Sequence, residues 1–590
     1  MKNRFLSVVL VAIALCAPCC GRAQTAPARQ PFGIYARFVP SGCISEYPRL
    51  GSNTDECISN SIEDLCTDTA ISGVAAFVQW DQISQTVGPT NSIVGTNQWN
   101  VLDDIFGAVE QYNLSNPTNP PKTIQLGIIP GFDTPQWVLN SVSNCDPMFP
   151  TNGVVDTNAV PTNCGCATFL SGEGPNVVYK NKLLPLPWNP FYTNAYATFV
   201  QCVAQRYGTN PLLVSVAVAG PTSDSTEMIV PNEKNNPANY WKWNSLFSLT
   251  FPTNYENSDQ AFIEAWERAI DVYGQAFSNV TLAVTTGNGL PNFTNSEGMP
   301  YTNYTIPPGF EWPPGSVNPK DRADIMDATA ETTVLAYFVD PRHGGNNAKA
   351  VQENGMTAME ITSSHILGGG DLNSYAIKWL AASSASGSAA LPGTTNVISR
   401  VLGGLQFDTS FSTDPQYEGC NMTDGCMDPG DPIISPEQAF YNALQVYFDG
   451  TSVGASYGTN DSSGALPLNY VQIYSDDIIY AETNTTGTNI VDGFGNTISN
   501  MTAQIEFNNA SNQIFQIAES VLYIRAASNT LQVLWPEAAP PYQLQVNDDL
   551  AKADGWKTNT NTSAPTVANG FYQVTINSSS GARFYRLALP

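Results

Sequence analysis

One glutamate stands at a place in this sequence where an acidic side chain is conspicuous. The apolar run VSVAVAGP (214–221) ends in Gly-Pro, and Glu227 follows it among threonine and serine residues. Only 13% of all residues are charged. A carboxyl group just past a buried strand can give a proton to a reacting group or take one from it. Two structural alternatives stay open. Glu227 is an exposed loop residue, or its negative charge caps the N-terminus of the following helix.

Eight short apolar runs, rich in β-branched residues, would have to position this glutamate. Helix-like segments lie between many of them, and strands that are apolar on both faces are typical of a parallel sheet. The pattern predicts an α/β fold, a (β/α)8 TIM barrel with long loops, in which reactive residues lie at the C-terminal ends of the strands. No glycine-rich phosphate loop follows the early runs, which disfavours an open nucleotide-binding sheet. The predicted strands are 33–38, 73–80, 123–131, 214–221, 281–287, 357–363, 401–407 and 469–475.

Three stretches resemble (β/α)8 retaining glycoside hydrolases, the clan that includes β-galactosidases and cellulases. AGPTSDSTEM (219–228) resembles the acid/base loop after the fourth strand of that clan. IIPGFDTPQWVL (128–139) resembles the end of its third strand, and PLPWNPFYTNAYATFVQCVAQRYG (185–208) resembles the helix that leads into the fourth. The resemblance covers about residues 30–485. It implies hydrolysis of a glycosidic bond, with Glu227 as the proton donor to the leaving oxygen.

The clan also has a nucleophilic carboxylate at the end of the seventh strand, and here the sequence departs from it. The predicted seventh strand carries Gln406 at that place. Glu360 after the sixth strand, or Asp408 two residues past Gln406, would take the role, and Asp476 after the eighth is a weaker choice. Carboxyl groups about 5–5.5 Å apart give retention of configuration, and about 6.5–9.5 Å gives inversion. Loss of the nucleophile is the alternative that stays open.

Aromatic and polar residues near the predicted strand ends suit a sugar pocket. Indole rings cover the apolar faces of pyranoses, while amides and carboxylates bind hydroxyl groups. Core packing is an equal alternative for each tryptophan. Tyr35 and Arg37 on the first strand alternate with apolar residues and could point into the mouth of the barrel. The predicted substrate-binding residues are Trp80, Trp137, Trp188, Asp133, Asn288, Gln406 and Asp476.

The composition excludes several classes of partner. The net charge is −27, and the 24 lysines and arginines are scattered, which disfavours nucleic acid and anionic membrane surfaces and favours neutral or cationic partners. The expected substrate is a neutral glycan. The two histidines come without a Gly-x-Ser-x-Gly motif, so a serine hydrolase is disfavoured. The cysteine spacing matches no zinc pattern. We expect no metal ion and no organic cofactor, and the oligomeric state stays open.

The N-terminus predicts export. Residues 1–23 have two positive charges, a short apolar stretch and a small-residue site, which indicate a signal peptide cleaved near Ala23. No later apolar run has the roughly 20 residues that a membrane span needs, so we expect a secreted or periplasmic protein without stable membrane insertion. Three of the 12 cysteines lie in this segment, where lipid attachment is the alternative. The other nine are expected mainly as disulfides.

The residue pattern changes after the predicted barrel domain, residues 30–485. Residues 486–517 predict a linking or closing segment, and residues 518–590 predict a small all-β sandwich of short strands between Pro, Asn and Gly turns. This last part resembles a C-terminal module of secreted bacterial proteins. Two other functions remain for the whole chain: a degenerate barrel that binds carbohydrate without cleaving it, and a surface scaffold.

Overall fold

The structure is a computed structural model, and it describes part of the chain. It covers 31, 33–43, 54–68, 71–87, 95–149 without 118, 156–171, 180–231 without 224, and 258–277. It also covers 242–243, 245–247, 250, 280–289, 333–334, 337–338, 355–357, 389–390, 397–398, 402–406, 468–475, 478, 490–491 and 497–498. Near the C-terminus it covers 523–527, 530–536, 543–547, 556–558, 566–568, 571–577 and 584–588. The predicted signal peptide, Glu360, Asp408 and Asp476 lie outside the described residues.

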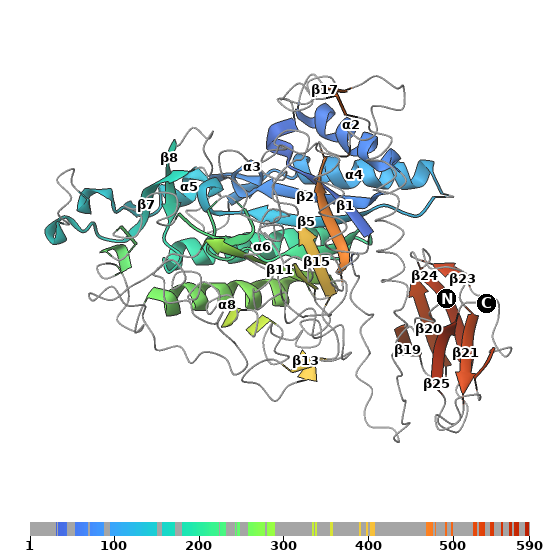
Figure 1. Cartoon of the computed structure of the whole chain (residues 1–590). Coiled ribbons are helices and arrows are strands. Elements are labelled where there is room, and N and C mark those ends of the chain that lie inside the picture. Colours follow the sequence, from blue (N-terminus) through green and yellow to red (C-terminus); the bar gives the residue numbers. More distant parts are fainter. Residues whose placement is uncertain are drawn as a thin grey trace.

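Eight parallel strands pair with one another in a ring. In order around the ring they are β1 (Gly33–Phe38), β2 (Ile71–Gln79), β5 (Thr123–Ile129), β9 (Leu213–Ala217), β11 (Thr281–Gly289), β12 (Gly355–Thr357), β15 (Leu402–Gln406) and β16 (Leu468–Tyr474). β16 pairs with β1 and closes the ring, so strands far apart in the sequence lie side by side (Figure 1). Each predicted apolar run overlaps one of these strands, although the sixth, expected at 357–363, is described only at Gly355–Thr357. The curled parallel sheet resembles a TIM barrel.

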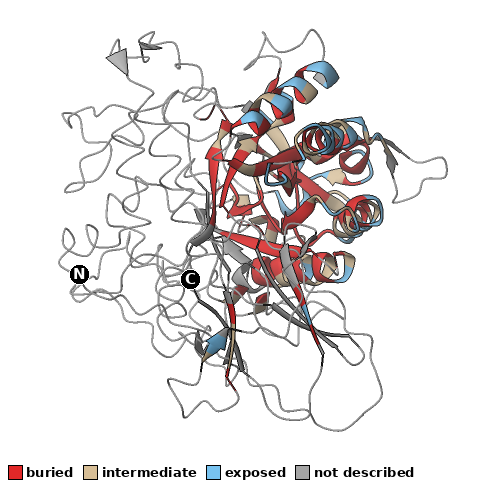
Figure 2. Cartoon of the chain, turned by 90° about the vertical axis from the view of Figure 1, so that its right-hand side faces the viewer, coloured by how far each residue is buried: buried red, intermediate tan, exposed pale blue. Residues whose placement is uncertain are grey.

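Long helices connect the first five ring strands. They are α2 (Thr54–Thr67), α4 (Asn100–Ser115), α6 (Pro190–Tyr207) and α8 (Ser258–Ala276). Their apolar residues recur every three or four positions, which buries one face and leaves the other to solvent; Figure 2 shows buried residues toward the strands and exposed residues on the outer sides. Asn189 caps α6 by accepting a hydrogen bond from the Phe191 amide at 3.0 Å, and Pro190 fits the first helical position.

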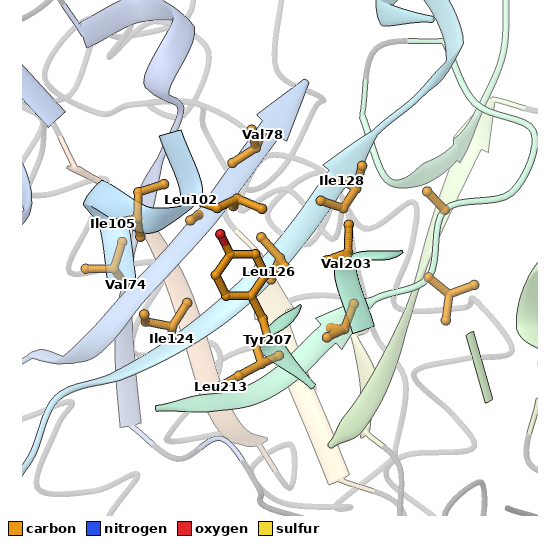
Figure 3. Close-up of a cluster of buried hydrophobic side chains, with 14 of the residues drawn as sticks. Val74, Val78, Leu102, Ile105, Ile124, Leu126, Ile128, Val203, Tyr207 and Leu213 are labelled. Atoms are coloured by element: carbon orange, nitrogen blue, oxygen red, sulfur yellow. The ribbon is translucent and has the colours of Figure 1, made fainter. Parts of the chain in front are cut away.

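The main core lies between these helices and the outward faces of the strands. Side chains of β2 and β5 alternate toward it and meet α4 and α6 (Figure 3). Phe106 of α4 stacks on Tyr207 of α6 with ring centroids 4.6 Å apart. The residues labelled in the close-up are Val74, Val78, Leu102, Ile105, Ile124, Leu126, Ile128, Val203, Tyr207 and Leu213. Strand residues two apart share a face, so the alternate residues of β2 and β5, which lie between the labelled ones, point into the ring.

An arm leaves the ring after β5. We call residues 143–185 the β6–β8 arm, since they hold β6 (Ser143–Asn144), β7 (Cys164–Ser171) and β8 (Lys180–Pro185) in one small sheet. A disulfide between Cys145 and Cys164 closes the base of the arm. A second disulfide joins Cys43 to Cys57, which lies in α2. Both bonds support the expectation that cysteines beyond the predicted signal peptide form disulfides, while Cys66, Cys166 and Cys202 are free thiols.

The C-terminal strands form two small antiparallel sheets. One contains β19 (Tyr523–Ala527), β20 (Thr530–Pro536), β24 (Phe571–Asn577) and β23 (Thr566–Ala568). The other contains β22 (Lys557–Thr558), β21 (Gln543–Asn547) and β25 (Phe584–Ala588). That these sheets pack as a sandwich domain over 518–590 remains a prediction. Within the described part of the chain, no helix is both long and apolar enough to cross a bilayer.

Glu267 on α8 provides a test of pH-dependent stability. Burial, with Glu264 and Asp271 nearby, raises the pKa of Glu267 to about 7 from its ordinary value of 4.5. Its stabilising contribution is therefore present below pH 4.5 and is lost as the pH rises through 7. We expect Glu267→Gln to raise Tm by about 1–3 °C at pH 8 and to leave it unchanged at pH 4. Scanning calorimetry at both pH values measures this, and an equal change at pH 4 contradicts it.

Candidate active site

The interior of the ring can be recognised from one hydrogen bond across it. Gln472 on β16 donates from Nε2 to Oε1 of Gln125 on β5 over 2.9 Å. β1 and β2 separate these strands in the ring, so both side chains must point inward. Cα partners in a parallel ladder lie on the same face of the sheet. Gln125 pairs with Ser215, and Ser215 with Thr281 of β11, so Thr281 also faces the interior.

Glu227 lies on the same inner face, near the C-terminal ends of the strands. β9 pairs with β11 as far as Ala283, and further along β11 its place is taken by the short strand β10 (Glu227–Ile229). Glu227 is the Cα partner of Thr285, which is four residues past Thr281 and shares its face. The glutamate is 5% exposed. β10 therefore continues the fourth ring strand, and Glu227 lies in a strand rather than in the loop that the sequence predicted.

The hydroxyl residues before Glu227 fix its backbone. Nine residues separate β9 from β10, and among them Ser223 donates its amide hydrogen to the Ile229 carbonyl at 2.7 Å. The Ser225 hydroxyl accepts from the Glu227 amide at 3.0 Å. These bonds satisfy backbone groups that a buried loop would otherwise leave unpaired. The small hydroxyl residues thus have a structural role next to the carboxylate.

The ends of the third and fourth strands touch at Gly131. The Phe132 amide donates to the Ser223 carbonyl at 2.6 Å. Gly131 has a φ of 62°, and a Cβ there would lie 1.9 Å from the Ser223 oxygen. Only glycine accommodates both this conformation and this close approach. The loop that carries Asp133 and the loop that leads to Glu227 are therefore joined directly.

Asp133 is a second buried carboxylate at this edge. It is 6% exposed, and its Oδ2 accepts a hydrogen bond of 3.0 Å from Nε2 of Gln79, at the end of β2. Its Oδ1 lies 3.9 Å from Nζ of Lys182 on β8. Arg37 at the end of β1 adds another cation, which lies over the rings of Phe77 and Tyr474 and donates to the Tyr474 hydroxyl.

The three predicted tryptophans pack in apolar cores. Trp80 is fully buried, with its ring centroid 5.0 Å from that of Tyr196 on α6, because the chain turns outward into the short helix α3 (Trp80–Ile83) directly after β2. Trp137 is 5% exposed and donates to the Ser84 carbonyl at 3.0 Å. Trp188 packs edge-on against Trp243. The core-packing alternative describes all three, so we do not propose that they stack on a sugar.

The remaining predicted residues are described only in part or not at all. Gln406 is the last residue of β15 and the Cα partner of Gln472, so it holds an inward register position. Asn288 lies in β11, near its end. Tyr35, 1% exposed, shares a hydrogen bond of 2.8 Å with Thr123. Glu360, Asp408 and Asp476 lie outside the described residues, so their distances from Glu227 stay open.

Two charged residues near the mouth were not among the predicted site residues. Asp81 directly follows Trp80 and is exposed. Neighbouring atoms that displace water raise the pKa of its carboxyl, while the charge of Lys182 lowers it in part. The strand-end criterion that selected Glu227 would also have selected Asp81. Lys182 has no such signal, since only the path of the β6–β8 arm brings it to Asp133. In the described residues, no group of three or more His, Cys, Asp or Glu side chains is placed to hold a metal ion.

Comparisons with known proteins give only distant similarities. No protein-family model matches the chain, and no curated protein matches it. Among solved structures, it is similar to endo-glycoceramidase II from Rhodococcus sp., solved as a lactosyl-enzyme intermediate, with 10% identity over 96% of this chain and 100% of that chain and a TM-score of 0.27. It is also similar to two β-galactosidases. That of Marinomonas ef1 has 9% identity, 83% and 60% coverage and a TM-score of 0.35, and that of Rahnella sp. R3 has 8% identity, 85% and 59% coverage and a TM-score of 0.34. These neighbours are glycoside hydrolases. Their sequence identities and TM-scores are too low to assign a function to this chain.

Proposed function

We propose that the protein is an exported glycoside hydrolase that acts on a neutral glycan, with Glu227 as the general acid. The observation that carries this proposal is the placement of Glu227: a buried carboxyl group on the inner face of the ring, at the continuation of the fourth strand. Hydrogen bonds of the residues before it hold the backbone of Glu227 in place. Catalytic groups need such fixed positions more than they need exposure.

In the proposed reaction, Glu227 protonates the glycosidic oxygen as the bond from that oxygen to the anomeric carbon breaks. The developing positive charge at the anomeric carbon needs an anion on the opposite side. Glu360 or Asp408 would supply it, either by bonding to the carbon or by taking a proton from an attacking water. Asp133, held by Gln79, would accept hydrogen bonds from sugar hydroxyls. Asn288, Gln406 and Asp476 are proposed to line the same pocket.

A barrel that binds carbohydrate without cleaving it is the second candidate. It is favoured by Gln406, because the last residue of the seventh ring strand, β15, is a glutamine where the clan has a nucleophilic carboxylate. An amide cannot bond to the anomeric carbon as a carboxylate does, although it can bind hydroxyl groups. A surface scaffold without a sugar site would be the third possibility.

A panel of neutral glycans separates these functions. We expect the purified protein to release reducing ends from at least one β-linked or α-linked neutral glycan, and we expect Glu227→Gln to bind that glycan but not to cleave it. Reducing-end assays together with calorimetric titration measure both quantities. Binding without turnover by the natural chain would replace the hydrolase with the binding function, and neither binding nor turnover would leave a scaffold.

The domain organisation is also part of the proposal: a signal peptide over 1–23, a barrel domain over 30–485, a linking segment over 486–517 and a sandwich module over 518–590. The two disulfides support export, because such bonds persist outside the reducing cytosol. Intact-mass measurement of the protein from its native host checks cleavage near Ala23.

A further inference from the structure

A second apolar core connects the β6–β8 arm to both buried carboxylates of the proposed site. Phe169 and Leu184 from the arm pack there with Trp188, Trp243 and Phe262, separate from the main core. This satellite core also contains Phe132, the residue before Asp133, and Val230, three residues after Glu227. Trp243 donates from its indole to the Pro231 carbonyl at 2.6 Å, just beyond β10. The arm is therefore packed against the two segments that carry the carboxylates.

Among the described residues of the arm, Lys182 lies close to Asp133. It lies on β8, which pairs with β7 through Phe169, and β8 contacts the turn Gly131–Asp133. Its Nζ lies 3.9 Å from Oδ1 of Asp133 and 5.8 Å from the centre of the Phe132 ring. The Lys182 side chain is 41% exposed, whereas that of Asp133 is 9% exposed. Asp133 is thus approached from two sides, by Gln79 at Oδ2 and by Lys182 at Oδ1.

We propose that Lys182 is a positioning residue, which holds the Asp133 carboxylate in a fixed rotamer so that it can bind sugar hydroxyls. This inference rests on the proposed function, since Asp133 needs a substrate to bind. A buried carboxylate without a cation or a full set of hydrogen bonds would be costly to keep charged. The arm thus contributes Lys182 to a carboxylate that Gln79 also contacts from the end of β2.

A double-mutant cycle on glycan hydrolysis tests this. We expect Lys182→Met to raise KM about five- to tenfold with kcat within about twofold, because an interaction made equally in the ground and transition states affects KM alone. Asp133→Asn should raise KM by at least as much. In the Asp133→Asn background, Lys182→Met should raise KM no further, and Lys182→Arg in the natural background should keep KM within about twofold of the natural value.

The matched control is Arg206→Met. Arg206 is 44% exposed and pairs with Asp103 between the outer helices, so its loss removes a similar ion pair far from the ring mouth. It should change neither KM nor kcat. An unchanged KM in Lys182→Met, or an equal rise in both backgrounds, overturns the positioning role while hydrolysis by the natural chain keeps the hydrolase. Absence of any turnover by the natural chain overturns the proposed function and this role with it.

Discussion

Glu227→Gln should lower kcat for glycan hydrolysis by about 10²–10⁴-fold, the usual loss when a general acid is removed. The amide has nearly the shape of the carboxyl group but no proton to give to the leaving oxygen. The fold should not change, since the bond from Ser225 goes to the backbone of residue 227 rather than to its side chain. Steady-state kinetics on the best substrate of the glycan panel measure the loss, and the thermal midpoint monitors the fold.

The leaving group decides whether Glu227 acts as the acid. The nitrophenolate of an aryl glycoside leaves without being protonated. On that substrate Glu227→Gln should therefore lose much less activity than on the natural glycan. If Glu227 were the nucleophile, its substitution would lower activity equally on the two substrates. Glu110→Gln, an exposed position on α4, serves as the control and should match the natural chain. Equal losses on the two substrates would remove Glu227 from the acid role.

Gly131→Ala should lower both the stability of the protein and its activity. A Cβ at this position would lie 1.9 Å from the Ser223 carbonyl oxygen. The φ of 62° lies in the left-handed region, which is unfavourable for alanine. The two loops must separate to admit it, at a cost of about 2–4 kcal/mol in the free energy of unfolding. Since Ser223 is hydrogen-bonded to Ile229 in β10, the shift reaches the strand of Glu227. Displacement of a catalytic group by about 1 Å can cost about 100-fold in rate.

Gly107→Ala is the matched substitution for this prediction. Gly107 lies inside α4, and a Cβ there would have no atom within 4 Å. Alanine is the better helix former, so the free energy of unfolding should rise by about 0.5–1 kcal/mol, with unchanged kinetics. Urea unfolding and glycan hydrolysis compare the two variants. Natural stability and natural kcat in Gly131→Ala would mean that the two loops are not coupled.

Local patterns in the sequence determined which segments become strands and where the acid follows them. Apolar, β-branched runs of strand length favour strands of a covered sheet, and all eight runs overlap ring strands. Glu227 follows this run along the chain, but nine residues separate β9 from β10, so the run alone does not fix where the glutamate lies. The helix over 190–207 also arises from local signals, since Asn189 and Pro190 begin it.

Tertiary structure alone decided where side chains beyond the strands point. A strand-end residue can turn inward to the mouth or outward to the helices, and Trp80 turns outward onto α6 because the chain bends there into α3. The continuation of β9 by β10 depends on pairing with β11, which is over fifty residues later in the chain. Lys182 meets Asp133 only because the arm folds onto its own apolar core. Hydrophobic periodicity records burial along one segment, whereas these contacts depend on the relative placement of segments that share no local pattern.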